Sequence, residues 1–180
     1  MVEVIEEKIK IPEKVEVELQ DGIVNIKGPN GEVSRRLYYP GIRIAKEGGE
    51  IVVGVENPRK RQKAVAGTFA SHIRNMLKGA TEGFEYKMKI VYSHFPITVK
   101  VSGKEILVEN YLGEKTPRKT QIVGSCAVKV KGTEVAVLGS DVEEVGQTVA
   151  NIEQLTRAHR RDVRVFQDGI YLVERNGAKV

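Results

Sequence analysis

An internal repeat is the feature that most constrains the fold of this chain of 180 residues. Residues 12–32 and 96–114 both begin with proline and both alternate apolar with polar residues. When Ile26 is aligned with Val108, Gly31 falls on Gly113. In each half, further alternating segments follow and then one helical pattern. The repeat predicts a duplicated fold, with the boundary between its halves near residue 82.

The alternating segments predict antiparallel strands, because a half-buried strand turns successive side chains to opposite faces. Asp21-Gly22 separates two such segments and is a hairpin signal. In the alignment, the counterpart of the quartet Gln-Asp-Gly-Ile at 20–23 is 102–106. The second Gln-Asp-Gly-Ile, at 167–170, has no counterpart, and we expect its Asp-Gly to turn the chain for the same local reason. Residues 85–92 predict an extra strand in the second half.

The segment 28–31, Gly-Pro-Asn-Gly, matches the short GxxG of KH domains, which clamp nucleotides. That loop joins two helices, whereas both flanks here alternate like strands. A hairpin turn is therefore the preferred interpretation of this segment.

Apolar residues three or four apart predict one amphipathic helix in each half. The first helix carries Val65, Phe69, Ile73, Met76 and Leu77, and the second carries Val142, Val145, Val149, Ile152 and Leu155. Asn57 and Pro58 are expected to start the first helix and Gly79 to end it. Asp141 and Glu144 resemble a capping box at the start of the second.

The predicted fold class is α+β, with two similar tandem domains, each an antiparallel-rich β-sheet packed against one α-helix. We expect an N-terminal domain over 1–82, its repeat over 83–156, and a basic C-terminal extension over 157–180. The extension is expected to be held in place by the packing of Val163, Val165 or Phe166.

Cations are clustered along the chain, although the net charge is only +5. Four arginines and one aspartate lie between 157 and 164, and smaller clusters occupy 59–63 and 115–119. Clustered cations indicate a polyanionic partner. Six glutamates among residues 1–20 keep a second hypothesis open, a module that binds an acidic protein. The cluster at 59–63 could equally be the solvated start of a helix.

No catalytic pattern is present, so we expect no enzyme, no cofactor and no metal site. His72, His94 and His159 follow no metal-ligand spacing, and the chain has no phosphate-binding loop, nucleophile elbow or dinucleotide fingerprint. The chain has a single cysteine and no long apolar run, which favours a cytoplasmic protein without a membrane partner.

The run from Asn151 to Arg175 resembles the C-terminal signature of the universal large-subunit ribosomal protein six family, in its archaeal and eukaryotic form. The match rests on Asn151 to Gln154 and then on Arg164, Phe166, Asp168, Gly169 and Tyr171. It extends over 27–37, 64–79 and 83–99.

The resemblance implies a structural component of the large ribosomal subunit, with roles in translation and subunit assembly. It implies binding to large-subunit ribosomal RNA near the stalk base and the factor-binding region, mainly through the second domain and the extension. It also implies neighbouring ribosomal proteins at the stalk base, translation factors nearby, and a monomer within the ribosome.

The candidate RNA-binding residues come from the basic clusters of the second half. Arginine offers a planar fork for phosphate oxygens, and its contacts release counterions from RNA. We assign phosphate contacts to Arg157, Arg160, Arg161 and Arg164, with His159 as a base or sugar partner. The further candidates are Lys115, Arg118, Lys119, Lys129 and Lys131. For the lysines, a merely solvated surface remains an open alternative.

Overall fold

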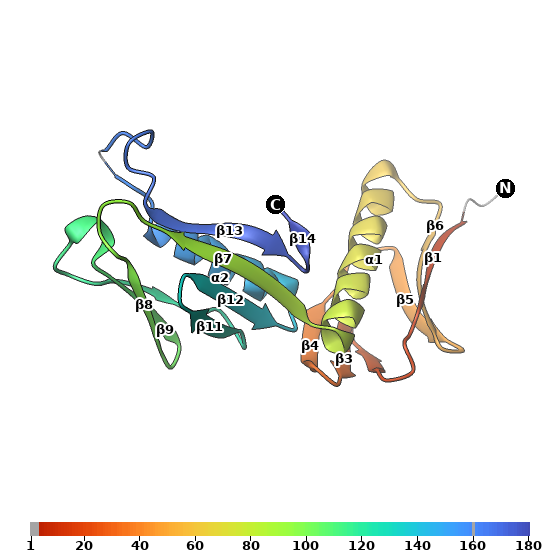
Figure 1. Cartoon of the computed structure of the whole chain (residues 1–180). Coiled ribbons are helices and arrows are strands. Elements are labelled where there is room, and N and C mark those ends of the chain that lie inside the picture. The colour runs from red at the N-terminus through yellow and green to blue at the C-terminus, as the bar shows by residue number, and fades with distance from the viewer. Residues whose placement is uncertain (1–3, 160) are drawn as a thin grey trace. The chain divides into compact units, whose positions relative to one another are not determined.

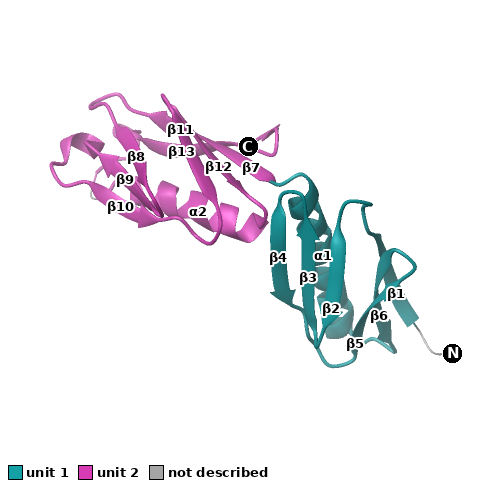
Figure 2. Cartoon of the chain, turned by 90° about the horizontal axis from the view of Figure 1, so that it is seen from below, with its two compact units in different colours: residues 1–83 teal, residues 84–180 magenta. Residues whose placement is uncertain are grey.

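The computed structural model describes residues 4–159 and 161–180, and the chain divides after Gly83 into two compact units (Figure 2). Unit 1 spans 1–83 and unit 2 spans 84–180. Each unit has its own hydrophobic core, and every described strand pairs within its own unit. The predicted α+β fold with an internal duplication is confirmed.

Unit 1 consists of two three-stranded antiparallel sheets packed on one helix, α1 (Lys60–Thr81). One sheet has the order β1-β6-β5, with the bounds β1 (Val4–Lys10), β5 (Ile42–Glu47) and β6 (Glu50–Glu56). The other has the order β2-β3-β4, with the bounds β2 (Glu16–Gln20), β3 (Ile23–Gly28) and β4 (Gly31–Arg36). Ile26, Ile51 and Ile73 are fully buried where the sheets meet the helix.

Unit 2 repeats this plan around α2 (Val142–Leu155). Its larger sheet has the order β11-β12-β7-β13-β14, with the bounds β7 (Phe84–Val91), β11 (Ala127–Lys131), β12 (Glu134–Gly139), β13 (Gly169–Arg175) and β14 (Ala178–Lys179). Its smaller sheet has the order β10-β9-β8, with the bounds β8 (Thr98–Ser102), β9 (Glu105–Glu109) and β10 (Arg118–Gln121). A short 3-10 helix, η1 (Tyr111–Gly113), precedes β10.

The two units correspond strand by strand, which corrects one prediction. The set β1-β6-β5 matches β7-β12-β11, and β2-β3-β4 matches β8-β9-β10. The strand predicted at 85–92 is therefore the counterpart of β1 and not an extra strand. The added strand is β13, which pairs antiparallel with β7 on the side away from β12 (Figure 1). Residues assigned to the predicted extension thus form β13 and β14 of this sheet.

The hairpin predictions are confirmed at three turns and wrong at a fourth. Asp21 and Gly22 have φ values of 48° and 76°, and Gly103 has 61° in the matching hairpin of unit 2. The segment 28–31 is the tight turn between β3 and β4. Asp168-Gly169, however, does not form a turn, because Gly169 opens β13 and the Asp168 side chain is buried.

Both ends of the first helix differ from the prediction. Asn57 has a left-handed φ of 46°, so α1 starts later, at Lys60, and the backbone N–H of Arg59 donates to Gln62 Oε1. Gly79 lies inside the helix, and Gly83, with φ of 76°, ends it. Neither helix of the described chain is long and apolar enough to cross a membrane.

In the second helix, Asp141 caps the N-terminus as predicted, because its carboxylate accepts from Glu143 N at 2.8 Å. Glu144 does not complete a capping box. Its carboxylate instead accepts from the backbone N–H of Ser125 at 3.0 Å, and so fixes the connection before β11.

Replacing Gly28 by alanine is expected to destabilise unit 1 by about 1–3 kcal/mol. A Cβ at Gly28 would lie 2.5 Å from the carbonyl oxygen of Ala80, and this backbone atom of α1 cannot move aside easily. Urea denaturation followed by circular dichroism measures the effect. Gly146→Ala, within α2, is the matched control, because a Cβ at Gly146 would meet no atom within 4 Å. Alanine favours the helix more than glycine, so this variant should stabilise unit 2 by up to about 1 kcal/mol.

Candidate nucleic-acid interface

The described arginines of the predicted cluster lie on the connection between α2 and β13, residues 157–168, which we call the arginine loop. It lies at the same end of unit 2 as η1 and the turn after β7 (Figure 1). The predicted residues Arg157, His159, Arg161 and Arg164 are all exposed on it. Arg160 lies outside the described residues. The fold therefore places the described arginines of the predicted cluster on one short, solvent-facing segment.

A buried carboxylate fixes the end of the arginine loop. The Asp168 side chain is fully buried, and its carboxylate accepts from Ser93 Oγ at 2.9 Å and from the backbone N–H of His94 at 3.2 Å. His94 Nδ1 lies 3.0 Å from the same carboxylate, which can only accept, so this ring nitrogen carries the proton. Burial disfavours the charged form, but the bonds from His94 and Ser93 outweigh it and hold the pKa of Asp168 below its ordinary value.

An aromatic contact joins this anchor to the arginines. The Phe166 ring stacks on the His94 ring with 4.9 Å between centroids, and the Arg161 guanidinium lies 4.7 Å from the centre of the Phe166 ring. Phe166 is half-buried, whereas Val163 and Val165 are 64% and 59% exposed. Of the three residues expected to hold the extension, Phe166 does so, and the two valines do not pack into the core.

Arg118 supports the loop from the neighbouring sheet. Its guanidinium binds the Glu114 carboxylate through two hydrogen bonds of 2.8 and 2.6 Å and lies 4.2 Å from the centre of the Tyr111 ring. The same group donates to the carbonyl oxygens of Leu155 at 2.7 Å and Arg157 at 3.4 Å. The hydrogen bond with Glu114 raises the pKa of Arg118. Arg118 thus lies beside the loop, with four of its five N–H donors used within the protein.

The end of α2 is joined directly to β13, and this closes the base of the loop. Thr156 Oγ1 accepts from the backbone N–H of Ile170 at 3.0 Å. A carboxylate oxygen of Glu153 accepts from the backbone N–H of Leu172 at 2.9 Å. Tyr111 also donates its hydroxyl to the carbonyl oxygen of Asp168 at 3.3 Å. The loop is therefore presented from a scaffold that is fixed at both of its ends.

The predicted lysines fall into two groups. Lys115 and Lys119 are exposed on the segment that leads from η1 into β10, on either side of Arg118 in the sequence. Lys119 follows Arg118 within β10, so their side chains point to opposite faces of the sheet. Lys129 and Lys131 are exposed on β11, which is the edge of the large sheet opposite β13 and β14. The fold does not bring this second pair to the loop.

Two further lysines, which the sequence reasoning did not select, lie on the same sheet face as Lys129 and Lys131. Lys129 is opposite Ala136, which is opposite Lys87, while Lys131 is opposite Glu134, which is opposite Lys89. Residues in one such row share a face of the sheet. The alternation of residues 85–92 already placed Lys87 and Lys89 on one face, and this was the available signal. Lys87 forms an ion pair of 2.8 Å with Glu174.

The chain contains two copies of one α+β scaffold, and the arginine loop lies in the second copy. These features define a basic protein built by duplication. No group of His, Cys, Asp and Glu side chains within the described ranges is arranged to hold a metal ion. The family described as Ribosomal protein L6 matches residues 11–83 and 95–169, one match to each repeat. The chain belongs to this ribosomal protein L6 family, which is structural and not enzymatic.

Archaeal proteins are similar over nearly the whole chain. The "Large ribosomal subunit protein uL6" of Methanosarcina mazei is 53% identical over 175 residues, which cover 97% of this chain and 99% of that protein. The protein of the same name from Methanobrevibacter smithii is 51% identical over 171 residues, or 95% of this chain and 96% of that protein. That of Methanothrix thermoacetophila is 49% identical, over 97% of this chain and 99% of that protein.

Proposed function

We propose that the protein is a structural component of the large ribosomal subunit and binds large-subunit ribosomal RNA through the arginine loop. Membership of the family and the names of the archaeal relatives support the ribosomal role. The observation that carries the RNA contact is the anchoring of an exposed arginine cluster by the buried Asp168 carboxylate. A loop that is anchored at both ends loses less conformational entropy on binding than a free tail, so more of its electrostatic attraction appears as affinity.

In this proposal the exposed cations have different roles. Arg157, Arg161 and Arg164, with Arg160 between them in sequence, contact phosphates, and His159 contacts a base or sugar. Lys115 and Lys119 add phosphate contacts beside the loop. Arg118 positions the loop, because its guanidinium is bound to Glu114 and to loop carbonyls. Lys129 and Lys131 are a separate candidate contact on the large sheet, on a face that they share with Lys87, Lys89 and Glu134.

The location in the subunit is proposed from the family resemblance. It places the protein as a monomer near the stalk base and the factor-binding region, with ribosomal proteins as neighbours and translation factors close by. In this proposal the protein contributes to translation and subunit assembly by holding one region of the ribosomal RNA in place. Unit 2 and the arginine loop supply most of the RNA contact.

A salt series tests the RNA contact. Binding of the full chain to a transcribed large-subunit RNA fragment is expected to fall steeply with salt, on the order of a thousandfold from low to moderate salt if six or more phosphates are contacted. The loss follows from the counterions that the cations release when they bind phosphates. Filter binding or fluorescence anisotropy measures the slope. A flat salt response would contradict the proposed electrostatic contact.

A further inference from the structure

Strand β1 has one open edge, although its counterpart in unit 2 has none. It pairs with β6 along Val4–Lys10, and no other described strand pairs with it. In unit 2 the equivalent edge of β7 is covered by β13, which pairs antiparallel with it. The equivalent edge in unit 2 thus accepts a further antiparallel strand, and the described residues of unit 1 do not supply one. An open edge of backbone donors and acceptors favours strand addition.

We propose that in the absence of RNA two copies of the chain associate by antiparallel pairing of their β1 strands, which joins their three-stranded sheets into one. The sequence of β1 is self-complementary when Glu7 is opposite Glu7 of the second copy. Glu6 then lies opposite Lys8 of the second copy, and Ile5 opposite Ile9. A two-fold axis makes each of these pairs occur twice. Lysines on an edge usually discourage pairing, but in this register they face glutamates.

On the helix side of the sheet, the pairing continues the hydrophobic core. Ile9 is 6% exposed and belongs to the core of unit 1, whereas Ile5 is only half-buried. Pairing would cover Ile5 with Ile9 of the second copy. Glu7 points to the same side and forms an ion pair of 2.6 Å with Arg74 of α1. Each of the two facing Glu7 carboxylates therefore has a cation of its own.

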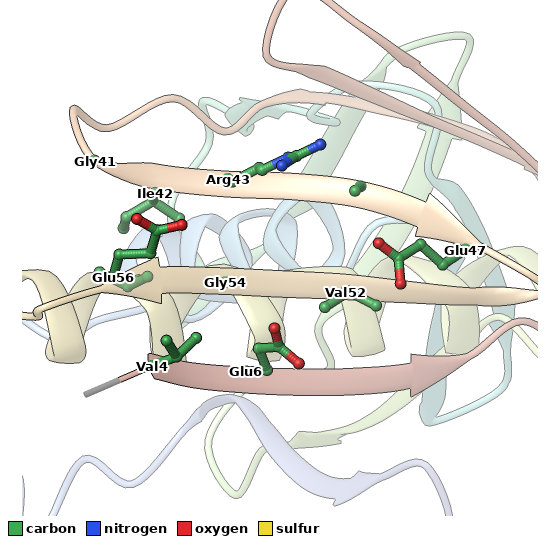
Figure 3. A pocket seen from close by; sticks show the side chains of 11 residues that line it. Val4, Glu6, Gly41, Ile42, Arg43, Glu47, Val52, Gly54 and Glu56 are labelled. Atoms are coloured by element: carbon green, nitrogen blue, oxygen red, sulfur yellow. The ribbon is translucent and has the colours of Figure 1, made fainter. Parts of the chain in front are cut away.

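On the other side of the sheet, an open hollow of about 500 Å³ is lined by the carboxylates of Glu6, Glu47 and Glu56 and by Arg43. Figure 3 shows Val4 and Glu6 on β1, Glu56 on β6 with its carboxylate toward Ile42 of β5, and Gly54, which has no side chain, in β6 between β1 and β5. Neither Glu6 nor Glu56 forms an ion pair with another described residue.

The proposed register supplies a cation to Glu6. Val4 of β1 is paired with Glu56 of β6 and would face Lys10 of the second copy, which places Val4 between Lys10 and Glu56. Lys8 of the second copy would lie directly opposite Glu6. The aliphatic part of Lys10 would also cover Val4, which is 51% exposed. The open edge and the self-complementary register therefore favour the same occupant, a second β1.

The test is sedimentation equilibrium of the full chain, free of RNA, over a range of concentrations. Glu6→Lys alone, or Lys8→Glu alone, places like charges in both symmetric pairs, and each is expected to raise the dimer dissociation constant about tenfold or more. Mixed in equal amounts, the two variants form only opposite-charge pairs with each other, so the mixture is expected to recover dimers. Glu18→Lys, on the exposed face of β2, is the control and should not change the dissociation constant.

Three results would overturn the proposal: a wild-type chain that stays monomeric at millimolar concentration, a dimer indifferent to both charge reversals, or a mixture that stays monomeric. A monomeric wild type would leave the β1 edge to a strand of a different protein. The outcome does not depend on the RNA contact, since the variants lie in unit 1 and the measurement contains no RNA.

Discussion

Replacing Arg157, Arg160, Arg161 and Arg164 together by glutamine is expected to weaken binding to large-subunit RNA by about 100- to 1,000-fold at moderate salt. Glutamine keeps much of the side-chain length and polarity but cannot neutralise a phosphate. The slope of log affinity against log salt should therefore become shallower by about three units if each arginine contacts one phosphate. Filter binding of wild type and variant to the same RNA fragment, over one salt series, measures both quantities.

A matched variant in unit 1 provides the comparison. Arg59, Lys60, Arg61 and Lys63 to glutamine removes the same charge from the start of α1. It is expected to lower RNA affinity much less, because the contact is assigned to unit 2. The reverse ranking would show that the RNA-binding unit has been wrongly assigned. Equal losses would mean that net charge alone, and not the fixed loop, decides binding.

Asp168→Asn is expected to destabilise unit 2 by about 2–3 kcal/mol and to release the arginine loop. The amide of asparagine has one acceptor oxygen, whereas the carboxylate has two oxygens that share a negative charge. The donors of Ser93 and His94 are therefore no longer all satisfied in this buried site. Trypsin cuts after arginine, so faster cleavage within 157–164 reports the release directly. RNA affinity should fall as well, even though no arginine has been changed.

The pH dependence of stability separates the anchor from general charge effects. The pKa of Asp168 is lower in the folded protein than in the unfolded chain, so its carboxylate stabilises the fold above the unfolded value of about 4. That contribution is lost as the pH falls through the folded pKa. Asp168→Asn should therefore reduce the acid sensitivity of unit 2. Asp21→Asn, at a turn that asparagine also tolerates, should leave both stability and trypsin cleavage unchanged.

The duplicated plan was predictable from the sequence because its signals are local. Alternation, the turn at Asp21-Gly22 and the counterpart at 102–106 identified matching hairpins without any knowledge of the fold. The pairing of strands distant in the chain was not predictable in this way. Gly169 lies opposite Val91, and nothing in either segment specifies that register, so the sequence predicts an extension where the structure has β13. The division of each unit into two sheets was missed for the same reason.

The candidate site was likewise only partly predictable from the sequence. The arginine cluster was visible as a dense run of like charge, whereas the residues that hold it were not. Asp168 resembled a turn residue because it precedes glycine, and its role depends on Ser93 and His94, far away in sequence. Arg118 resembled the lysines around it, and only the fold shows that its guanidinium is bound to Leu155 and Arg157 carbonyls.

The position of β13 has a consequence for the order in which the protein folds during synthesis. Unit 1 draws all of its described strand pairs from the first part of the chain and can fold while the rest is still being made. In unit 2, β7 emerges before α2 and its partner β13 emerges after it, so that edge of β7 stays open until β13 has been made. The arginine loop lies between α2 and β13, and Asp168 at its end is bound to Ser93 and His94, which follow β7. The proposed RNA-binding surface can therefore take its anchored form only after β13 has been synthesised.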